Sequence, residues 1–174
     1  MCRVDKIEIR KFSFEDIPLK IDWINNTVNN KYLHYDLPLE YEKTVAWYNK
    51  IKNADTRYDA TVIYNGKPVG LVGLLNIDTV NLKAEYYICL GEDSAKGKGV
   101  ATVASKMLIK YAFETLKLNK IYLYTEEANV AAQKLFERLG FVREGFLKED
   151  IIYRDKKINR FAYALLKEGA DYDF

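Results

Sequence analysis

The chain has 174 residues, 49% of them hydrophobic, which is enough apolar material for the core of one compact domain over residues 1–174. Its 27 basic and 25 acidic residues leave a formal charge of +2, which argues against a general nucleic-acid or membrane surface. The two cysteines, Cys2 and Cys89, stand at no spacing typical of a metal site or a disulfide framework. Because the chain also shows no apolar signal-peptide core and no stretch long enough to span a membrane, we expect a cytoplasmic protein.

The N-terminal part predicts one strand and two helices. Residues 7–12, IEIRKF, alternate apolar and charged side chains, which is the period of a half-buried strand. Ser13 followed by Asp16 predicts a capped start for a helix that carries Trp23. Beyond a polar passage, apolar residues recur at helical spacing and predict a second amphipathic helix over residues 40–53.

The middle of the chain predicts three strands. Residues 58–64 and 67–77 flank Asn65-Gly66, a dipeptide that supplies the positive φ values of a two-residue hairpin turn. The second strand is apolar on both faces, which predicts a place inside the sheet. Residues 84–91, AEYYICLG, predict the third strand.

The C-terminal half alternates helices with strands. An apolar stripe over residues 100–116 predicts a long helix, and residues 120–125, KIYLYT, predict a short strand. Residues 129–140 predict a helix that ends at its glycine, and the remainder predicts two strands joined at residues 154–157, RDKK. The order indicates a mixed α and β fold in which helices interrupt one sheet.

A glycine-lysine turn precedes the long helix. Gly97 and Gly99 remove side chains where a strand passes into a helix, so that successive backbone N–H groups can point at one bound group. The positive end of the helix and the charges of Lys96 and Lys98 make a phosphate or pyrophosphate the expected occupant. An ordinary solvated turn is the alternative, and neither nucleotide-binding glycine fingerprint is present.

The turn and a second segment carry a family resemblance. The turn resembles the Gln/Arg-x-x-Gly-x-Gly/Ala motif of the GNAT superfamily of acetyl-CoA-dependent N-acetyltransferases, with lysine at the first position. The family's Asn-x-x-Ala-x-x-Leu-Tyr/Phe-x-x-x-Gly-Phe segment is similar to residues 129–141. The motif positions of the turn are occupied by Lys96, Gly97, Lys98, Gly99, Val100 and Ala101.

The resemblance implies a GNAT fold of the α+β class, with a central, mostly antiparallel, splayed sheet flanked by helices. It also implies acetyl-CoA as cosubstrate, without a metal, and places the pyrophosphate of coenzyme A on the turn. The pantetheine arm would lie between strands 84–91 and 120–125, bound by the backbone of Ile88, Cys89 and Leu90. Asn129 would hold the arm near the thioester end, and it also suits the N-cap of the following helix.

Glu85 is the candidate catalytic base. It lies in an apolar run of the strand that lines the expected gap, and similar acetyltransferases use a glutamate on this strand. Partial burial would raise the pKa of its carboxyl toward useful values. The alternative is a structural glutamate satisfied by a hydroxyl or an arginine. A backbone N–H near residues 88–90 is the expected oxyanion donor.

The general acid departs from the family pattern. Phe136 stands where many family members carry a tyrosine, and it has no proton to give. Tyr122, Tyr124 and Tyr153 are candidate substitutes, although core or surface roles suit all three. Coenzyme A thiolate is a fairly good leaving group, so the missing tyrosine does not by itself abolish transfer.

Two further side chains raise alternatives. Cys89 shares a strand face with the candidate base and could carry a covalent acetyl group, but a lone cysteine in an apolar strand is usually a small buried side chain. Direct transfer is therefore preferred. His34 lies in the variable N-terminal part and suits a substrate-side or surface role better than that of a base.

The acceptor is left open among a small amine, a polyamine, an amino sugar, and a peptide or protein N-terminus. A Trp-x-Asn pattern at Trp23 and Asn25, with Trp47 beyond it, resembles the branch that acetylates ribosomal-protein alanine and amino sugars, although both tryptophans also suit core packing. A polyamine pocket would ordinarily be rich in acidic side chains, and the sequence shows no compact acidic cluster. The competing hypotheses are a catalytically silent coenzyme A sensor and, less favoured, an unrelated phosphate-binding protein. A homodimer is also left open.

Overall fold

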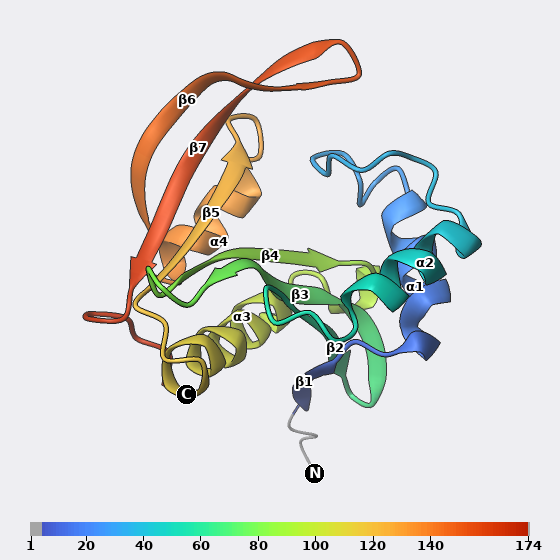
Figure 1. Cartoon of the computed structure of the whole chain (residues 1–174), viewed down its shortest axis with the longest axis horizontal. Coiled ribbons are helices and arrows are strands. Elements are labelled where there is room, and N and C mark those ends of the chain that lie inside the picture. The colour runs from blue at the N-terminus through green and yellow to red at the C-terminus, as the bar shows by residue number, and fades with distance from the viewer. Residues whose placement is uncertain (1–4, 174) are drawn as a thin grey trace.

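The computed structural model describes residues 5–173, whose strands form one sheet (Figure 1). Cys2 lies outside these residues. The strands are β1 (Ile7–Lys11), β2 (Tyr58–Tyr64), β3 (Lys67–Asp78), β4 (Lys83–Leu90), β5 (Lys120–Glu126), β6 (Val142–Tyr153) and β7 (Lys156–Leu166). The helices are α1 (Ile17–Asn25), α2 (Tyr41–Ile51), α3 (Val100–Lys110) and α4 (Val130–Arg138).

The sheet is mostly antiparallel. Its strand order is β1-β2-β3-β4-β5-β7-β6, and β4 with β5 forms the one parallel pair among the described strands. β3 lies between β2 and β4, which confirms the interior place predicted from its two apolar faces. The predicted α+β class with a mostly antiparallel sheet is confirmed.

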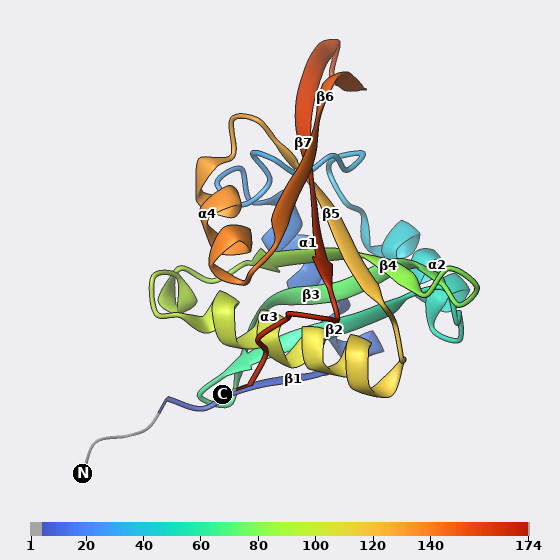
Figure 2. The ribbon, with the colours of Figure 1, turned by 90° about the vertical axis from the view of Figure 1, so that its left-hand side faces the viewer.

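A two-residue turn closes each of the two predicted strand pairs. Asn65 and Gly66 have φ values of 50° and 81° and connect β2 to β3. Arg154 and Asp155 have φ values of 50° and 61° and connect β6 to β7. The second turn accepts the left-handed conformation without glycine, and its hairpin projects from the rest of the protein (Figures 1 and 2).

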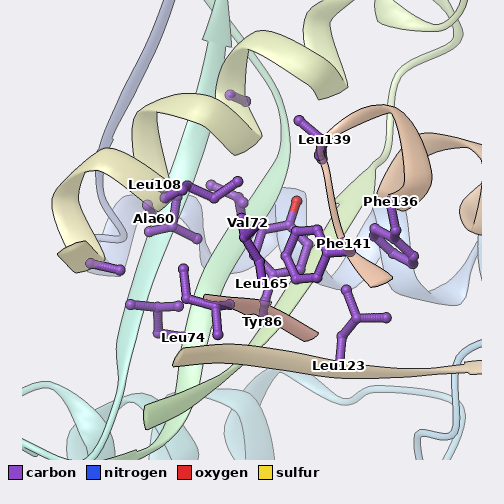
Figure 3. Close-up of a cluster of buried hydrophobic side chains, with 14 of the residues drawn as sticks. Ala60, Val72, Leu74, Tyr86, Leu108, Leu123, Phe136, Leu139, Phe141 and Leu165 are labelled. Carbon is purple, nitrogen blue, oxygen red and sulfur yellow. The ribbon is translucent and has the colours of Figure 1, made fainter. Parts of the chain in front are cut away.

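Helices cover both faces of the N-terminal half of the sheet. α3 packs on one face of β1–β4, while α1 and α2 pack on the other (Figure 2). Figure 3 shows the main core, where side chains of α3, the sheet and α4 meet, among them Leu108, Tyr86 and Phe141. Trp23 is buried in the smaller core under α1, as expected for a packing role.

Two helix boundaries differ from the prediction. Ser13 and Asp16 do form a capping box, but they cap a short 3-10 turn, Phe14–Asp16, that precedes α1. The helix predicted over residues 100–116 ends at Lys110 and continues as a π-helical turn, Tyr111–Thr115. The apolar stripe runs through α3 and the π-helical turn, because both bury side chains in the same core. The stripe therefore predicted which residues are buried, but not the change in hydrogen-bond pattern.

The sheet opens between β4 and β5. The two strands pair only from Lys83 with Lys120 to Glu85 with Tyr122. Beyond these residues β4 stays paired with β3, and β5 stays paired with β7, but β4 and β5 no longer pair with each other. The splayed gap expected from the sequence is therefore present.

No helix among residues 5–173 has both the length and the apolar character needed to cross a membrane.

Candidate functional site

The glycine-lysine turn presents free backbone donors at the start of α3. Gly97 and Gly99 have φ values of 71° and 75°, where a side chain would be strained, and nothing lies within 4 Å of the Cβ that either would carry. Gly99 is the N-cap, so the N–H groups of the first turn, which begins at Val100, have no partner within the helix. Together with the helix dipole, these donors form a cradle that fits a phosphate or pyrophosphate.

The two lysines of the turn lie beside this cradle with partners of their own. The Nζ of Lys96 donates to the side chains of Asn29 and Asp93, each at 2.8 Å. The Nζ of Lys98 lies 5.7 Å from the centroid of the Tyr64 ring. Both add positive potential to the turn, while Lys96 also ties it to the segment that follows α1.

A cleft of about 510 Å³ occupies the gap between β4 and β5. We call it the central cleft, and its other walls include residues of α4 and residues 32–35. The predicted site residues that line it are Glu85, Ile88, Cys89, Leu90, Ala101 and Asn129. The other predicted turn residues, 96–100, do not line the cleft and directly precede Ala101 in the chain.

The backbone of β4 offers hydrogen-bonding groups to the gap at alternate residues. The N–H of Gly91 donates to the carbonyl of Val69 at 2.8 Å, so Gly91 faces β3. Because an antiparallel strand alternates the direction of its backbone groups, Cys89 also faces β3, whereas Ile88 and Leu90 face the gap. Of the three residues predicted to bind the pantetheine arm through their backbone, two therefore present free groups there.

Glu85 stands where the paired part of β4 ends. Its Oε2 accepts a hydrogen bond of 3.0 Å from the side-chain amide of Asn76, and its register partner on β5 is Tyr122. The carboxylate lines the central cleft and has one fixed amide partner, so it can accept a proton there.

Asn129 and Phe136 occupy the second predicted segment. The side chain of Asn129 lines the cleft and accepts a hydrogen bond of 3.3 Å from the N–H of Ala132, so it caps α4. Phe136 is 7% exposed and packs against Tyr86 and Phe141, with ring centroids 6.0 Å apart in both pairs. At this position the chain has a core aromatic that also forms part of the cleft wall.

A family model described as an acetyltransferase (GNAT) domain matches residues 6–142. The chain belongs to the GNAT acetyltransferase family. It is thus an N-acetyltransferase, and acetyl-CoA is its cosubstrate. Among residues 5–173, no group of three or more His, Cys, Asp or Glu side chains could hold a metal ion.

Relatives and solved structures agree on the family and differ in the acceptor that their names give. Spermidine N(1)-acetyltransferase of Escherichia coli K12 is 30% identical over 86% of this chain and 80% of its own length. The Bacillus subtilis protein YdaF, named provisionally as a ribosomal N-acetyltransferase, is 34% identical over 63% of this chain and 59% of its own length. A Vibrio cholerae spermidine N-acetyltransferase in complex with CoA and spermine is similar in structure, with a TM-score of 0.86, 26% identity, and 93% and 96% of the two chains covered.

The three tyrosines considered as general acids of this acetyltransferase lie in different places. Tyr124 lines the central cleft, and its ring centroid lies 4.6 Å from the Cζ of Arg160. Tyr153 donates to the backbone carbonyl of Tyr35 at 2.7 Å. Tyr122 stands outside the cleft wall, and burial, with the neighbouring carboxylate of Glu85 as a second cause, raises its pKa.

Sequence reasoning missed the role of residues 26–40, which we call the interhelix segment. Its side chains reach the far wall of the cleft: the Nε2 of His34 lies 2.6 Å from the Oε1 of Glu126, and the Tyr32 hydroxyl donates to the carbonyl of Ala128 at 3.2 Å. His34 therefore lines the central cleft, and its substrate-side role stays a prediction. The asparagine-rich run NNTVNN at residues 25–30 was the available signal, because asparagine fixes irregular backbone.

A second cavity adjoins the central cleft. It measures about 600 Å³ and lies between the interhelix segment and α2, and we call it the side pocket. Trp47 lines it and also packs edge-on against Phe12, with ring centroids 5.8 Å apart. The packing role expected for this tryptophan is thus present, and the same residue lines a cavity that the sequence did not predict.

Proposed function

We propose that this acetyltransferase transfers the acetyl group of acetyl-CoA directly to a primary amine in the central cleft. The observation that carries the proposal is the alignment of three features along one path: the N–H cradle at residues 97–101, the unpaired backbone of Ile88 and Leu90, and the carboxylate of Glu85. A sensor that only binds coenzyme A needs the first two features and not the third.

The proposed binding residues are Lys96, Gly97, Lys98, Gly99, Val100, Ala101, Ile88, Leu90 and Asn129, together with Cys89, which lines the cleft although its backbone faces β3. Bound acetyl-CoA supplies an activated acetyl group and a thiolate leaving group. The turn binds the pyrophosphate through its free N–H groups and the helix dipole. The gap-facing N–H of Ile88 or Leu90 is placed to donate to the carbonyl oxygen as negative charge develops on it.

Glu85 is the proposed base. The reaction forms a bond between the acceptor nitrogen and the acetyl carbon, breaks the thioester C–S bond, and releases one proton from the nitrogen. Glu85 takes up this proton, directly or through a water molecule. The hydrogen bond from Asn76 holds one carboxylate oxygen in place.

Direct transfer is favoured over a covalent step on Cys89. Burial raises the pKa of the Cys89 thiol, so the thiol stays protonated near neutral pH and is a poor nucleophile. The departing thiolate needs a proton, and Tyr124 is the candidate donor because, of the three tyrosines considered, it is the one that lines the cleft.

The acceptor class proposed from the sequence is an amino sugar, a small amine or a protein N-terminus. The relatives named for spermidine support a small amine, and the relative named for ribosomal proteins supports a protein N-terminus. We also propose a cytoplasmic setting, as the cysteine usage suggests.

The proposal is tested with Glu85→Gln, which keeps the shape of the side chain and removes the base. Release of coenzyme A thiol in the presence of an amine panel should fall about 10²- to 10⁴-fold in kcat, with little change in acetyl-CoA binding. Glu127→Gln is the matched control, because Glu127 also accepts an asparagine amide, at 3.1 Å from Asn159, and lies outside the central cleft. A Glu85→Gln variant within twofold of wild type would show that another group takes the proton.

A further inference from the structure

Lys20 is a buried cation without a counter-ion. It lies on α1 and is 5% exposed, and within residues 5–173 no hydrogen bond or ion pair reaches its Nζ. Buried lysines are normally paired, because removing an ammonium group from water is costly. The Nζ of Lys20 has no such partner, and because it is not sealed from the adjoining cavity, a bound group can reach it there.

The Nζ of Lys20 points into the side pocket between two aromatic rings. It lies 4.5 Å from the ring centroid of Trp47 and 5.3 Å from that of Tyr35, and all three residues line this pocket. Burial lowers the pKa of Lys20 to about 8, and the nearby charges of Asp59 and Arg57 shift it in opposite directions.

The other charges around the side pocket already have partners or lie at its rim. Arg57 uses its guanidinium fork on Asp59, at 2.7 and 2.8 Å. Lys43 pairs with Glu40 at 2.7 Å, and Asp36 is exposed. The inner part of the pocket therefore holds one uncompensated positive charge.

The side pocket adjoins the proposed transfer site. Tyr35, Arg57 and Leu75 line both this pocket and the central cleft. Leu75 is also the register partner of Glu85 on β3. One molecule can therefore reach from the proposed base into the pocket.

We propose that the side pocket binds an anionic group, a carboxylate or a phosphate, of the acceptor amine, and that Lys20 is its counter-ion. This inference rests on the proposed function, because the acceptor is defined by the reaction at Glu85. It assigns a substrate class different from the polyamines in the names of the spermidine relatives. A polycation in this pocket would meet the uncompensated charge of Lys20 in a setting where water screens it poorly.

The test compares matched amines that differ by one anionic group. The pairs are lysine and cadaverine, ornithine and putrescine, glucosamine 6-phosphate and glucosamine, and phosphoethanolamine and ethanolamine, with spermidine added as a polycation. Thiol release gives kcat/KM, and the thermal shift of the acetyl-CoA-loaded enzyme gives binding. The test variant is Lys20→Met. The control is Lys50→Met, which removes one exposed lysine of α2 that lines neither the central cleft nor the side pocket.

We expect wild type to prefer the anionic member of at least one pair by tenfold or more. Lys20→Met should lose about 10- to 100-fold of this preference, the effect of removing a hydrogen bond to a charged group. The rate with the neutral member of the pair and the behaviour of Lys50→Met should not change. A preference that survives in Lys20→Met overturns the inference.

Failure of the inference and failure of the proposed function give different results. Acetylation of spermidine or cadaverine in preference to every anionic amine, unaffected by Lys20→Met, contradicts the inference alone. Lys20-dependent binding of an anionic amine without acetyl transfer contradicts the proposed function alone. If acetyl-CoA-loaded enzyme neither binds nor acetylates any anionic member, the inference is also wrong.

Discussion

The buried charge of Lys20 has a consequence for stability as well as for binding. Lys20→Met replaces an unpaired ammonium with an unbranched apolar side chain of similar length. We expect the free energy of unfolding at pH 7 to rise by about 1–3 kcal/mol, because the desolvation of the charge is removed. Chemical denaturation of wild type and variant measures this difference. A variant less stable than wild type at pH 7 would mean that the aromatic contacts outweigh the desolvation.

The same substitution predicts a pH dependence with a definite sign. The folded-state pKa of Lys20, about 8, lies below its ordinary value of 10.5, so the unfolded chain binds more protons between these limits. The free energy of unfolding of wild type therefore rises as pH increases through that window. The stability difference between Lys20→Met and wild type becomes smaller. Denaturation at pH 7 and pH 9.5 should show the smaller difference at the higher pH. A difference that does not change with pH would contradict the assigned cause.

At the scale of elements, the interhelix segment connects α1 to the glycine-lysine turn. The Nδ2 of Asn29 donates to the carbonyls of Trp23 and Gly91, at 3.2 and 3.0 Å, and its Oδ1 accepts from Lys96. Trp23 itself donates to Glu92 at 2.7 Å. The end of α1, the end of β4 and the turn are thus held in one hydrogen-bonded arrangement.

Asn29→Ala should weaken acetyl-CoA binding about 3- to 10-fold, because Lys96 and the end of β4 lose a common partner near the cradle. Asn30→Ala is the matched control, because Asn30 donates to the carbonyl of Ile24 at 3.0 Å and makes no contact with the turn. Calorimetric titration with acetyl-CoA compares the two variants. Equal affinities would indicate that the segment does not position the turn.

Short sequence patterns predicted the helices, strands and turns, whereas contacts between residues distant in sequence determine how these elements pack together. Asn65-Gly66 was sufficient for its hairpin because the required φ values belong to those two residues. The glycines of the turn gave the cradle for the same reason. The pairing of His34 with Glu126 joins residues 92 positions apart, and periodicity carries no information about such a contact.

At the scale of the whole molecule, the site lies where two halves of the sheet separate. β4 keeps its partner in the N-terminal half and β5 keeps its partner in the C-terminal half, so the cleft depends on strands that stop pairing. Family resemblance predicted this splay and pointed to Glu85, whereas the turn was predicted from its own residues. The side pocket was not foreseen, because Lys20, Trp47 and Arg57 come from α1, α2 and the loop before β2 and lack a common motif.

The proposed reaction requires that acetyl-CoA binds at the turn, and thermal unfolding with and without acetyl-CoA tests this most directly. Gly99→Glu would place a negative side chain in the open space of the cradle. Gly66→Glu is the matched control, since Gly66 has a φ value of 81° and equally open surroundings in the β2–β3 hairpin. We predict that acetyl-CoA raises the midpoint of wild type and Gly66→Glu alike and leaves folded Gly99→Glu unchanged. An equal rise in Gly99→Glu, or no rise in wild type, would contradict the assignment of the coenzyme site.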